Sequence, residues 1–145
     1  MRVLVQRSNN ASCVVDGKTV ASIDNGLVLF VGFTEGDTIE NIEYLCKKIV
    51  NLRIFDDENG VMNESILEQD NYKILSISQF TLYADTKKGN RPSYINSLNG
   101  RDAIKLYDLF NHELEKYISV EKGIFGANMK INLINDGPTT ILLEK

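Results

Sequence analysis

The chain has 145 residues, of which 43% are hydrophobic and 25% are charged. This length fits one domain with a substantial core, and the composition excludes an intrinsically disordered chain. The net charge of −4 argues against a broad surface for nucleic-acid backbone, because such surfaces are basic. A pocket that takes only one end of an RNA needs few charges and remains compatible with this composition.

The sequence predicts a cytosolic protein with no metal, cofactor or membrane contact. Cys13 and Cys46 lie far apart without a CxxC partner, which favours two reduced, semi-buried thiols over a disulfide or a zinc site. The first residues lack the apolar stretch of a signal peptide, and no apolar run is long enough to span a bilayer.

The first part of the chain is predicted to form strands. After an opening strand, Asp16-Gly17 predicts a hairpin turn between strands at 12–15 and 18–23. Asn25-Gly26 predicts a second turn. The continuous apolar run 27–33 suits a strand that is buried on both faces.

The hydrophobic period then changes to that of a helix. Apolar residues recur at three- and four-residue steps over 39–52, and Asp37 or Thr38 can cap this helix. Residues 54–62 have the pattern of a second hairpin. A long strand is predicted over 73–84, because most of its residues are apolar or β-branched.

The last part of the chain is predicted to alternate between loop, helix and strand. Residues 85–99 form a polar loop, and 101–118 form a helix. A strand over 128–133, a turn at 135–138 and a final strand over 139–143 follow. The predicted apolar helix face consists of Ala103, Tyr107, Phe110, Leu114 and Tyr117.

This order of elements predicts an α+β fold. We expect a single compact domain over residues 1–145, with a curved, barrel-like, mostly antiparallel or mixed sheet and two main helices. No repeat, linker or low-complexity segment interrupts the chain.

The usual catalytic sets are missing. There is no GxGxxG, no P-loop and no metal-ligand spacing. His112, the one histidine, lies beside the predicted apolar helix face and is expected at the surface, which makes a Ser-His-Asp triad improbable. The acidic run 56–58 adjoins a turn and suits a solvated hairpin tip. Lys87, Lys88 and Arg91 form either a solvated loop or a contact with the phosphates of an RNA end.

Two short segments indicate chemistry. Ser78-Gln79-Phe80-Thr81 places polar side chains in an otherwise apolar strand, either as an internal hydrogen-bond network or as groups that meet a substrate. Asn135-Asp136-Gly137-Pro138-Thr139-Thr140 contains one of the two prolines. It is either an ordinary tight turn or a rigid backbone wedge.

Together, at this spacing, the two segments resemble the signatures of the D-aminoacyl-tRNA deacylase family, Ser-Gln-x-Thr and Asn-x-Gly-Pro-x-Thr. The resemblance extends over essentially the whole chain. It includes the segments Met1 to Arg7, Phe55 to Asn63, Gly89 to Ser93 and Phe125 to Met129.

The resemblance implies a homodimer with its active site at the subunit interface. The Gly137-Pro138 bond would be cis, and the pair would reach into the partner's pocket to refuse L-amino acids. The substrate would be tRNA with a D-amino acid on its 3′-terminal adenosine. Glycine has no side chain to refuse, so glycyl-tRNA mischarged on tRNA(Ala) would be a second substrate. No cofactor is implied.

The resemblance and the residue chemistry together predict two groups of site residues. The catalytic group, which holds and polarises the ester, is Ser78, Gln79, Phe80 and Thr81. Arg7 is expected to donate to the carbonyls of Gly137 and Pro138, and the segment from Phe125 is expected to receive the adenosine. The group for substrate binding and chiral selection is Gly137, Pro138, Arg7, Asn135, Thr140, Phe125, Gly126, Ala127 and Met129.

Three other functions remain open at this point. The chain could be a non-catalytic module that binds RNA or nucleotides in the same pocket. It could be a structural dimer whose Gly-Pro turn only closes an interface. It could also be a small esterase that acts on free metabolites.

Overall fold

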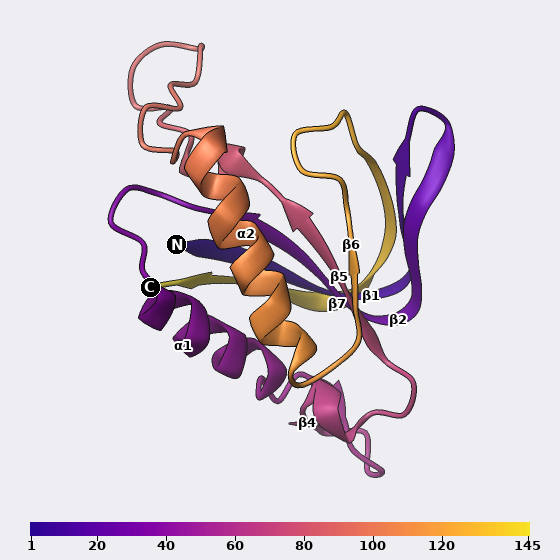
Figure 1. Ribbon diagram of the computed structural model, residues 1–145. Coiled ribbons are helices and arrows are strands. Elements are labelled where there is room, and N and C mark those ends of the chain that lie inside the picture. Colours follow the sequence, from indigo (N-terminus) through magenta and orange to yellow (C-terminus); the bar gives the residue numbers. More distant parts are fainter.

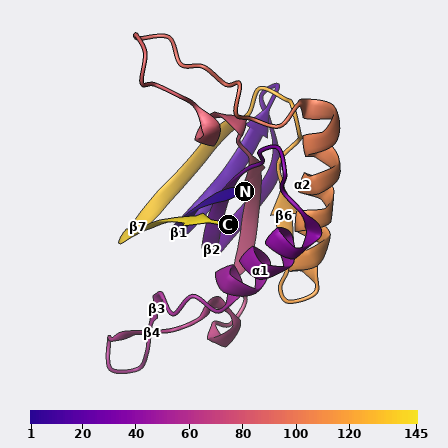
Figure 2. The same ribbon diagram turned by 90° about the vertical axis from the view of Figure 1, so that its left-hand side faces the viewer.

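The computed structural model describes residues 1–145. Its centre is a five-stranded mixed sheet of order β6-β5-β2-β1-β7, and both long helices lie on one face of that sheet (Figures 1 and 2). The sheet is open, since β6 and β7 form its two edges. The strands are β1 (Arg2–Val15), β2 (Lys18–Gly32), β5 (Lys73–Ser78), β6 (Val120–Lys122) and β7 (Lys130–Glu144). The predicted α+β class is confirmed.

The first hairpin is longer than predicted. β1 and β2 pair antiparallel on either side of Asp16 and Gly17, as the sequence indicates. The predicted turn at Asn25-Gly26 is wrong, because β2 continues through it. Gly26 begins the parallel pairing with β5 at Lys73, and a Cβ built on Gly26 would lie only 1.8 Å from the Lys73 carbonyl oxygen. The glycine therefore permits close approach of a strand rather than a turn.

The predicted strand over 73–84 is too long. β5 runs parallel to β2 and ends at Ser78. The Gln79 N–H still donates to the Val31 carbonyl at 2.7 Å. The chain then turns into a short 3₁₀ helix, η2 (Phe80–Tyr83). The polar residues that interrupt the apolar pattern therefore mark the end of the strand.

Both predicted helices form. α1 (Ile39–Val50) begins at Thr38, whose side chain completes a capping box with Asn41. α2 (Gly100–Glu115) begins at Asn99. Four of the five residues predicted for its apolar face are buried, but Tyr117 lies beyond the helix end and is exposed. The main core lies between these helices and the sheet.

The C-terminal segment is one strand, where two strands and a turn were predicted. β7 pairs with β1 both before and after residues 136–139, which bulge from the ladder. The predicted hairpin over 54–62 forms as β3 (Phe55–Asp56) and β4 (Met62–Glu64), followed by η1 (Ile66–Glu68).

The remaining expectations concern single side chains and the membrane. Cys13 and Cys46 are free thiols, and both are fully buried rather than semi-buried. His112 is exposed on α2, as predicted. Neither helix combines the length and the apolar character that a bilayer crossing requires.

Candidate active site

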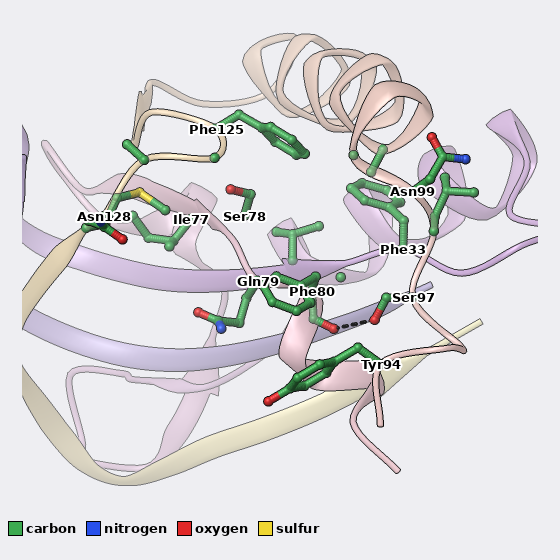
Figure 3. A pocket seen from close by; sticks show the side chains of 18 of the residues that line it. Phe33, Ile77, Ser78, Gln79, Phe80, Tyr94, Ser97, Asn99, Phe125 and Asn128 are labelled. Carbon is green, nitrogen blue, oxygen red and sulfur yellow. Dashed lines mark hydrogen bonds between the residues drawn. The ribbon is translucent and has the colours of Figure 1, made fainter. Parts of the chain in front are cut away.

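A pocket of about 770 Å³ lies where the carboxyl ends of β2 and β5 meet the beginning of α2. Because β2 and β5 are parallel, their ends lie at the same edge of the sheet. The segment 125–131, which leads into β7, forms the opposite wall. Figure 3 shows Ser78 between Phe125 on one side and Phe80 on the other. The pocket therefore brings together residue Ser78 and its neighbours, which the resemblance implied would hold the ester, and the segment from Phe125, which it implied would bind the adenosine.

Ser78 and Gln79 follow one another at the strand end and point in different directions (Figure 3). The Ser78 side chain lines the pocket and is half-buried. The Gln79 side chain donates through Nε2 to the Thr81 hydroxyl. Thr81 itself does not line the pocket. The hydroxyl of Thr81 therefore fixes the Gln79 amide in this structure.

Phe80 begins η2 and forms an aromatic wall of the pocket. The residue is 56% exposed, and its ring packs edge to face on Tyr94, with the ring centroids 5.0 Å apart. Its carbonyl accepts a hydrogen bond of 2.8 Å from the Ser97 hydroxyl. These two contacts hold the 94–99 segment against η2.

Gly32, at the end of β2, lets the strand end of β5 come close. A Cβ at this position would lie 2.8 Å from the Gln79 carbonyl oxygen and 3.2 Å from Leu82 Cβ. The first of these atoms belongs to the backbone and cannot swing away. Gly32 therefore determines where the Gln79 backbone lies.

Few ionisable groups reach the pocket. Of the 20 residues that line it, Tyr94 and Lys130 are the only ones with a titratable side chain. Behind the wall, burial raises the pKa of Tyr107, whose hydroxyl donates to the Ser76 carbonyl at 2.8 Å. Burial also raises the pKa of Cys13. Neither group is placed to exchange protons with a bound molecule. No side chain in this pocket has the partner that would make it a general acid or base.

The Gly137-Pro138 segment lies elsewhere in the chain. Gln6 pairs with Thr140 and Ser8 with Asn135, so Arg7 alone faces the four residues of the bulge. The Gly137-Pro138 peptide bond is cis, as the resemblance implied. Both residues are exposed, and neither lines the pocket of their own chain.

Arg7 is buried under this bulge, with 8% of its surface exposed. Its Nε donates to the Asp136 carbonyl at 3.2 Å and lies 2.9 Å from the Asp136 carboxylate. Its Nη1 donates to the Ile54 carbonyl at 2.7 Å. The expectation of donation to the Gly137 and Pro138 carbonyls is wrong, because the wide bulge turns the Asp136 carbonyl toward β1 instead.

Asn135 and Thr140 close the base of the bulge. The Asn135 amide donates to the carbonyls of Arg7 and Thr139, each at 3.1 Å. The Thr140 hydroxyl donates to Asn135 Oδ1 at 3.3 Å. The signature residues on either side of Gly137-Pro138 therefore hold the shape of the bulge.

The sequence did not indicate several residues of the pocket. Phe33, Ser97, Leu98 and the start of α2 all line it. The sequence pattern could have indicated Phe33, because this residue ends the apolar run 27–33 that was predicted to be buried. The other three belong to a segment that reads only as a polar loop and a helix start.

The fold and the pocket together define a small α+β protein with an apolar pocket of substrate size, formed at strand ends. The family model for D-Tyr-tRNA(Tyr) deacylase matches residues 4–144. The chain therefore belongs to this family.

Individual relatives agree with this assignment. The D-aminoacyl-tRNA deacylase of Bacteroides fragilis (strain ATCC 25285) is 54% identical over 146 residues, which cover 99% of this chain and 97% of the relative. The corresponding protein of Bacteroides thetaiotaomicron is 53% identical over the same shares of both chains.

Two solved structures share the fold. One, described as a c-Myc DNA unwinding element binding protein, has a TM-score of 0.93 at 36% identity and covers 100% of this chain and 99% of its own. The other, a probable eukaryotic D-amino acid tRNA deacylase, has a TM-score of 0.83 at 19% identity. It covers 98% of this chain and 97% of its own, and it supports the fold alone.

Proposed function

We propose that this chain is a cytoplasmic D-aminoacyl-tRNA deacylase, a single deacylase-like domain over residues 1–145. It hydrolyses the ester between a D-amino acid and the 3′-terminal adenosine of tRNA, and it releases free tRNA and the D-amino acid. The observation that carries the proposal is the pocket, which joins the end of β5 to the segment 125–131. The membership of the chain in the deacylase family supports it.

The scarcity of ionisable groups in the pocket suits this reaction. An aminoacyl ester is already activated, so hydrolysis needs mainly placement and stabilisation of the oxyanion. A water molecule attacks the carbonyl carbon, and the bond to the ribose oxygen breaks. The water supplies the hydroxyl of the amino acid and the proton that the ribose oxygen takes up. The ribose 2′-hydroxyl, which lies beside the ester, is the group that assists this transfer.

The backbone at the start of η2 is our candidate for the oxyanion site. The N–H groups of Phe80 and Thr81 open a helix turn and have no carbonyl one turn earlier within it. The Ser78 side chain, two residues before Phe80, lines the same pocket and is half-buried. In this arrangement Gln79 and Thr81 position the turn, and Thr81 is not a nucleophile, because no base adjoins it.

The segment 125–129 is our candidate for the adenosine site. Phe125, Ala127 and Met129 line the pocket together with the backbone of Gly126. The Phe125 ring lies 5.8 Å from the Tyr107 ring, centroid to centroid, which keeps it in place. An aromatic ring and a thioether offer the flat, polarisable surface on which a base stacks.

The Gly137-Pro138 bulge acts in the pocket of a second copy. A Cβ on Gly137 would meet nothing within 4 Å in its own chain, so the lack of a side chain serves something outside it. β7 is an edge strand with Ile134 and Leu142 exposed to 57% and 50%, as at an interface between subunits. We therefore propose a homodimer with composite active sites.

Chiral selection then comes from exclusion. The rigid bulge faces the substrate Cα, so an L side chain collides with it and a D side chain points away. Glycine carries no side chain, and glycyl-tRNA mischarged on tRNA(Ala) is therefore hydrolysed as well.

The test measures release of amino acid from D-tyrosyl-tRNA, L-tyrosyl-tRNA and glycyl-tRNA. We expect hydrolysis of the first and third and negligible hydrolysis of the second. Equal release from D and L substrates would contradict the wedge, and release from none would favour a binding module. Cleavage of simple D-amino-acid esters as fast as the tRNA ester would favour a metabolite esterase.

A mixed dimer tests the composite site. One variant carries Ser78→Ala with Gln79→Ala in the pocket, and the other has residues 136–139 replaced by a two-residue turn. Each homodimer should fail to hydrolyse D-tyrosyl-tRNA selectively, whereas the co-purified heterodimer should regain selective hydrolysis at one of its two sites. If the heterodimer hydrolyses D-tyrosyl-tRNA no faster and no more selectively than the two homodimers, the proposal of a site shared between subunits is contradicted.

Binding to DNA is the second candidate, because one solved relative is described as a c-Myc DNA unwinding element binding protein. The net charge of −4 disfavours a surface that follows a phosphate backbone. A competition experiment distinguishes the deacylase from the DNA-binding protein. If the chain is a deacylase, added duplex DNA should not inhibit its hydrolysis of D-tyrosyl-tRNA at physiological salt.

A further inference from the structure

Gly123 lies directly after β6, against the back of the pocket wall. Its N–H donates to the Ser76 carbonyl of β5 at 2.9 Å. Its backbone does not adopt the left-handed conformation seen at other glycines such as Gly126. The backbone alone therefore does not require glycine at this position.

The space that a side chain would fill is occupied by other residues. A Cβ on Gly123 would lie 2.6 Å from Met129 Sδ, 3.1 Å from Ile77 Cδ1 and 3.5 Å from Cys13 Sγ. The first distance is far below van der Waals contact, and the second is tight. The Met129 thioether thus packs into the place of the missing side chain.

Only one of these neighbours can yield easily. Ile77 and Cys13 are buried, at 1% and 0% exposure, and packing surrounds them. Met129 has a flexible, unbranched side chain and borders the open pocket. A methyl group at position 123 would therefore push the Met129 thioether forward, into the pocket.

We infer that Gly123 is a positioning residue for substrate binding, because its missing side chain holds the Met129 thioether back and sets the room for the terminal nucleoside. This inference rests on the proposed function, which assigns that end of the pocket to adenosine. Gly123 acts through Met129 and does not itself line the pocket.

The test compares Gly123→Ala in the wild-type and Met129→Ala backgrounds, with D-tyrosyl-tRNA as substrate. In the wild-type background we expect KM to rise about tenfold with kcat changed less than about twofold, the size of a modest overpacking effect. In the Met129→Ala background the same change should raise KM less than about twofold, because the displaced thioether is gone. The midpoint of urea unfolding should not fall, since a flexible side chain yields.

The outcomes separate this inference from the proposed function. If the wild-type protein hydrolyses D-tyrosyl-tRNA and Gly123→Ala leaves KM unchanged, the inference is wrong. An equal rise of KM in both backgrounds also overturns it, as does a KM effect that follows a loss of stability. If the wild-type protein does not hydrolyse the substrate, the proposed function fails first and takes the inference with it.

Discussion

Thr81 and Gln79 form a hydrogen-bonded pair at the end of β5, and this pairing assigns them a common task. A hydroxyl that accepts from an amide can orient that amide and the turn that follows. A nucleophile would instead need a base, and no carboxylate, histidine or cysteine lines the pocket.

The first prediction concerns this pair. Thr81→Val should lower kcat for D-tyrosyl-tRNA about tenfold, the cost of one misplaced donor, and Thr81→Ser should restore most of it. A loss of more than about a thousandfold, the range seen for lost nucleophiles, would instead make Thr81 the attacking group. Single-turnover rates measure the chemical step directly.

The bulge at 136–139 is held by Arg7 from the facing strand, in addition to Asn135 and Thr140 at its base. Arg7 lies alone opposite four residues and holds them through the Asp136 carbonyl and carboxylate. It also bonds the Ile54 carbonyl, which ties the bulge to the β3-β4 hairpin. The geometry of the bulge therefore depends on a fork of donors that only arginine provides.

The second prediction follows from this arrangement. Arg7→Ala should lower the free energy of unfolding by about 2–3 kcal/mol, because buried carbonyls lose a charged donor. It should also lower the ratio of D to L hydrolysis. Arg7→Lys is the matched control and should recover stability only in part. An unchanged D to L ratio in a folded Arg7→Ala protein would show that the bulge does not select.

η2 supplies a third prediction, through Tyr83. Burial, reinforced by Asp37, raises the pKa of Tyr83 to about 12 from an ordinary 10.0. Between pH 10 and 12, the Tyr83 hydroxyl keeps its proton in the folded state and loses it in the unfolded state. The unfolded state therefore binds fewer protons in this range. The stability from this group is complete below pH 10 and is lost as pH rises through 12.

Urea unfolding of the wild-type protein and Tyr83→Phe measures this effect. The unfolding midpoint should fall more steeply between pH 10 and 12 in the wild-type protein, because phenylalanine has no proton to lose. Parallel curves for the two proteins would mean that Tyr83 does not contribute to alkaline sensitivity.

Charge over the protein as a whole limits how RNA can bind. The net charge of −4 disfavours a broad surface that follows the phosphate backbone of tRNA. Lys87, Lys88 and Arg91 lie exposed in the loop after η2, and the same loop continues to Tyr94, which lines the pocket. We propose that these three side chains contact a phosphate of the RNA end.

The fourth prediction tests that placement. Replacing Lys87, Lys88 and Arg91 with alanine should weaken tRNA binding and flatten its salt dependence, by about one unit of slope per lost contact. The fold should persist, because all three side chains are exposed. Unchanged affinity would leave these residues as an ordinary solvated loop.

Local patterns in the sequence determined much of this structure. Helical spacing and Thr38 predict α1, and Asp16-Gly17 predicts the first hairpin, because each depends on neighbouring residues alone. The motifs at 78–81 and 135–140 likewise identify the family. The sequence also showed that the usual catalytic sets are missing.

Only the tertiary structure decided where these parts meet. Asn25-Gly26 has turn composition yet lies within β2, because pairing with β1 and β5 outweighs local preference. Residues 136–139 bulge from β7 without ending it, because the residues on either side of the bulge pair with β1. The end of β5 at Ser78, the burial of Arg7 and the packing of Met129 against Gly123 depend on segments distant in the sequence. The Gly137-Pro138 bulge, on which the resemblance placed chiral selection, lies outside its own chain's pocket, because β7 lines that pocket only as far as Ile131 and the bulge follows further along the strand.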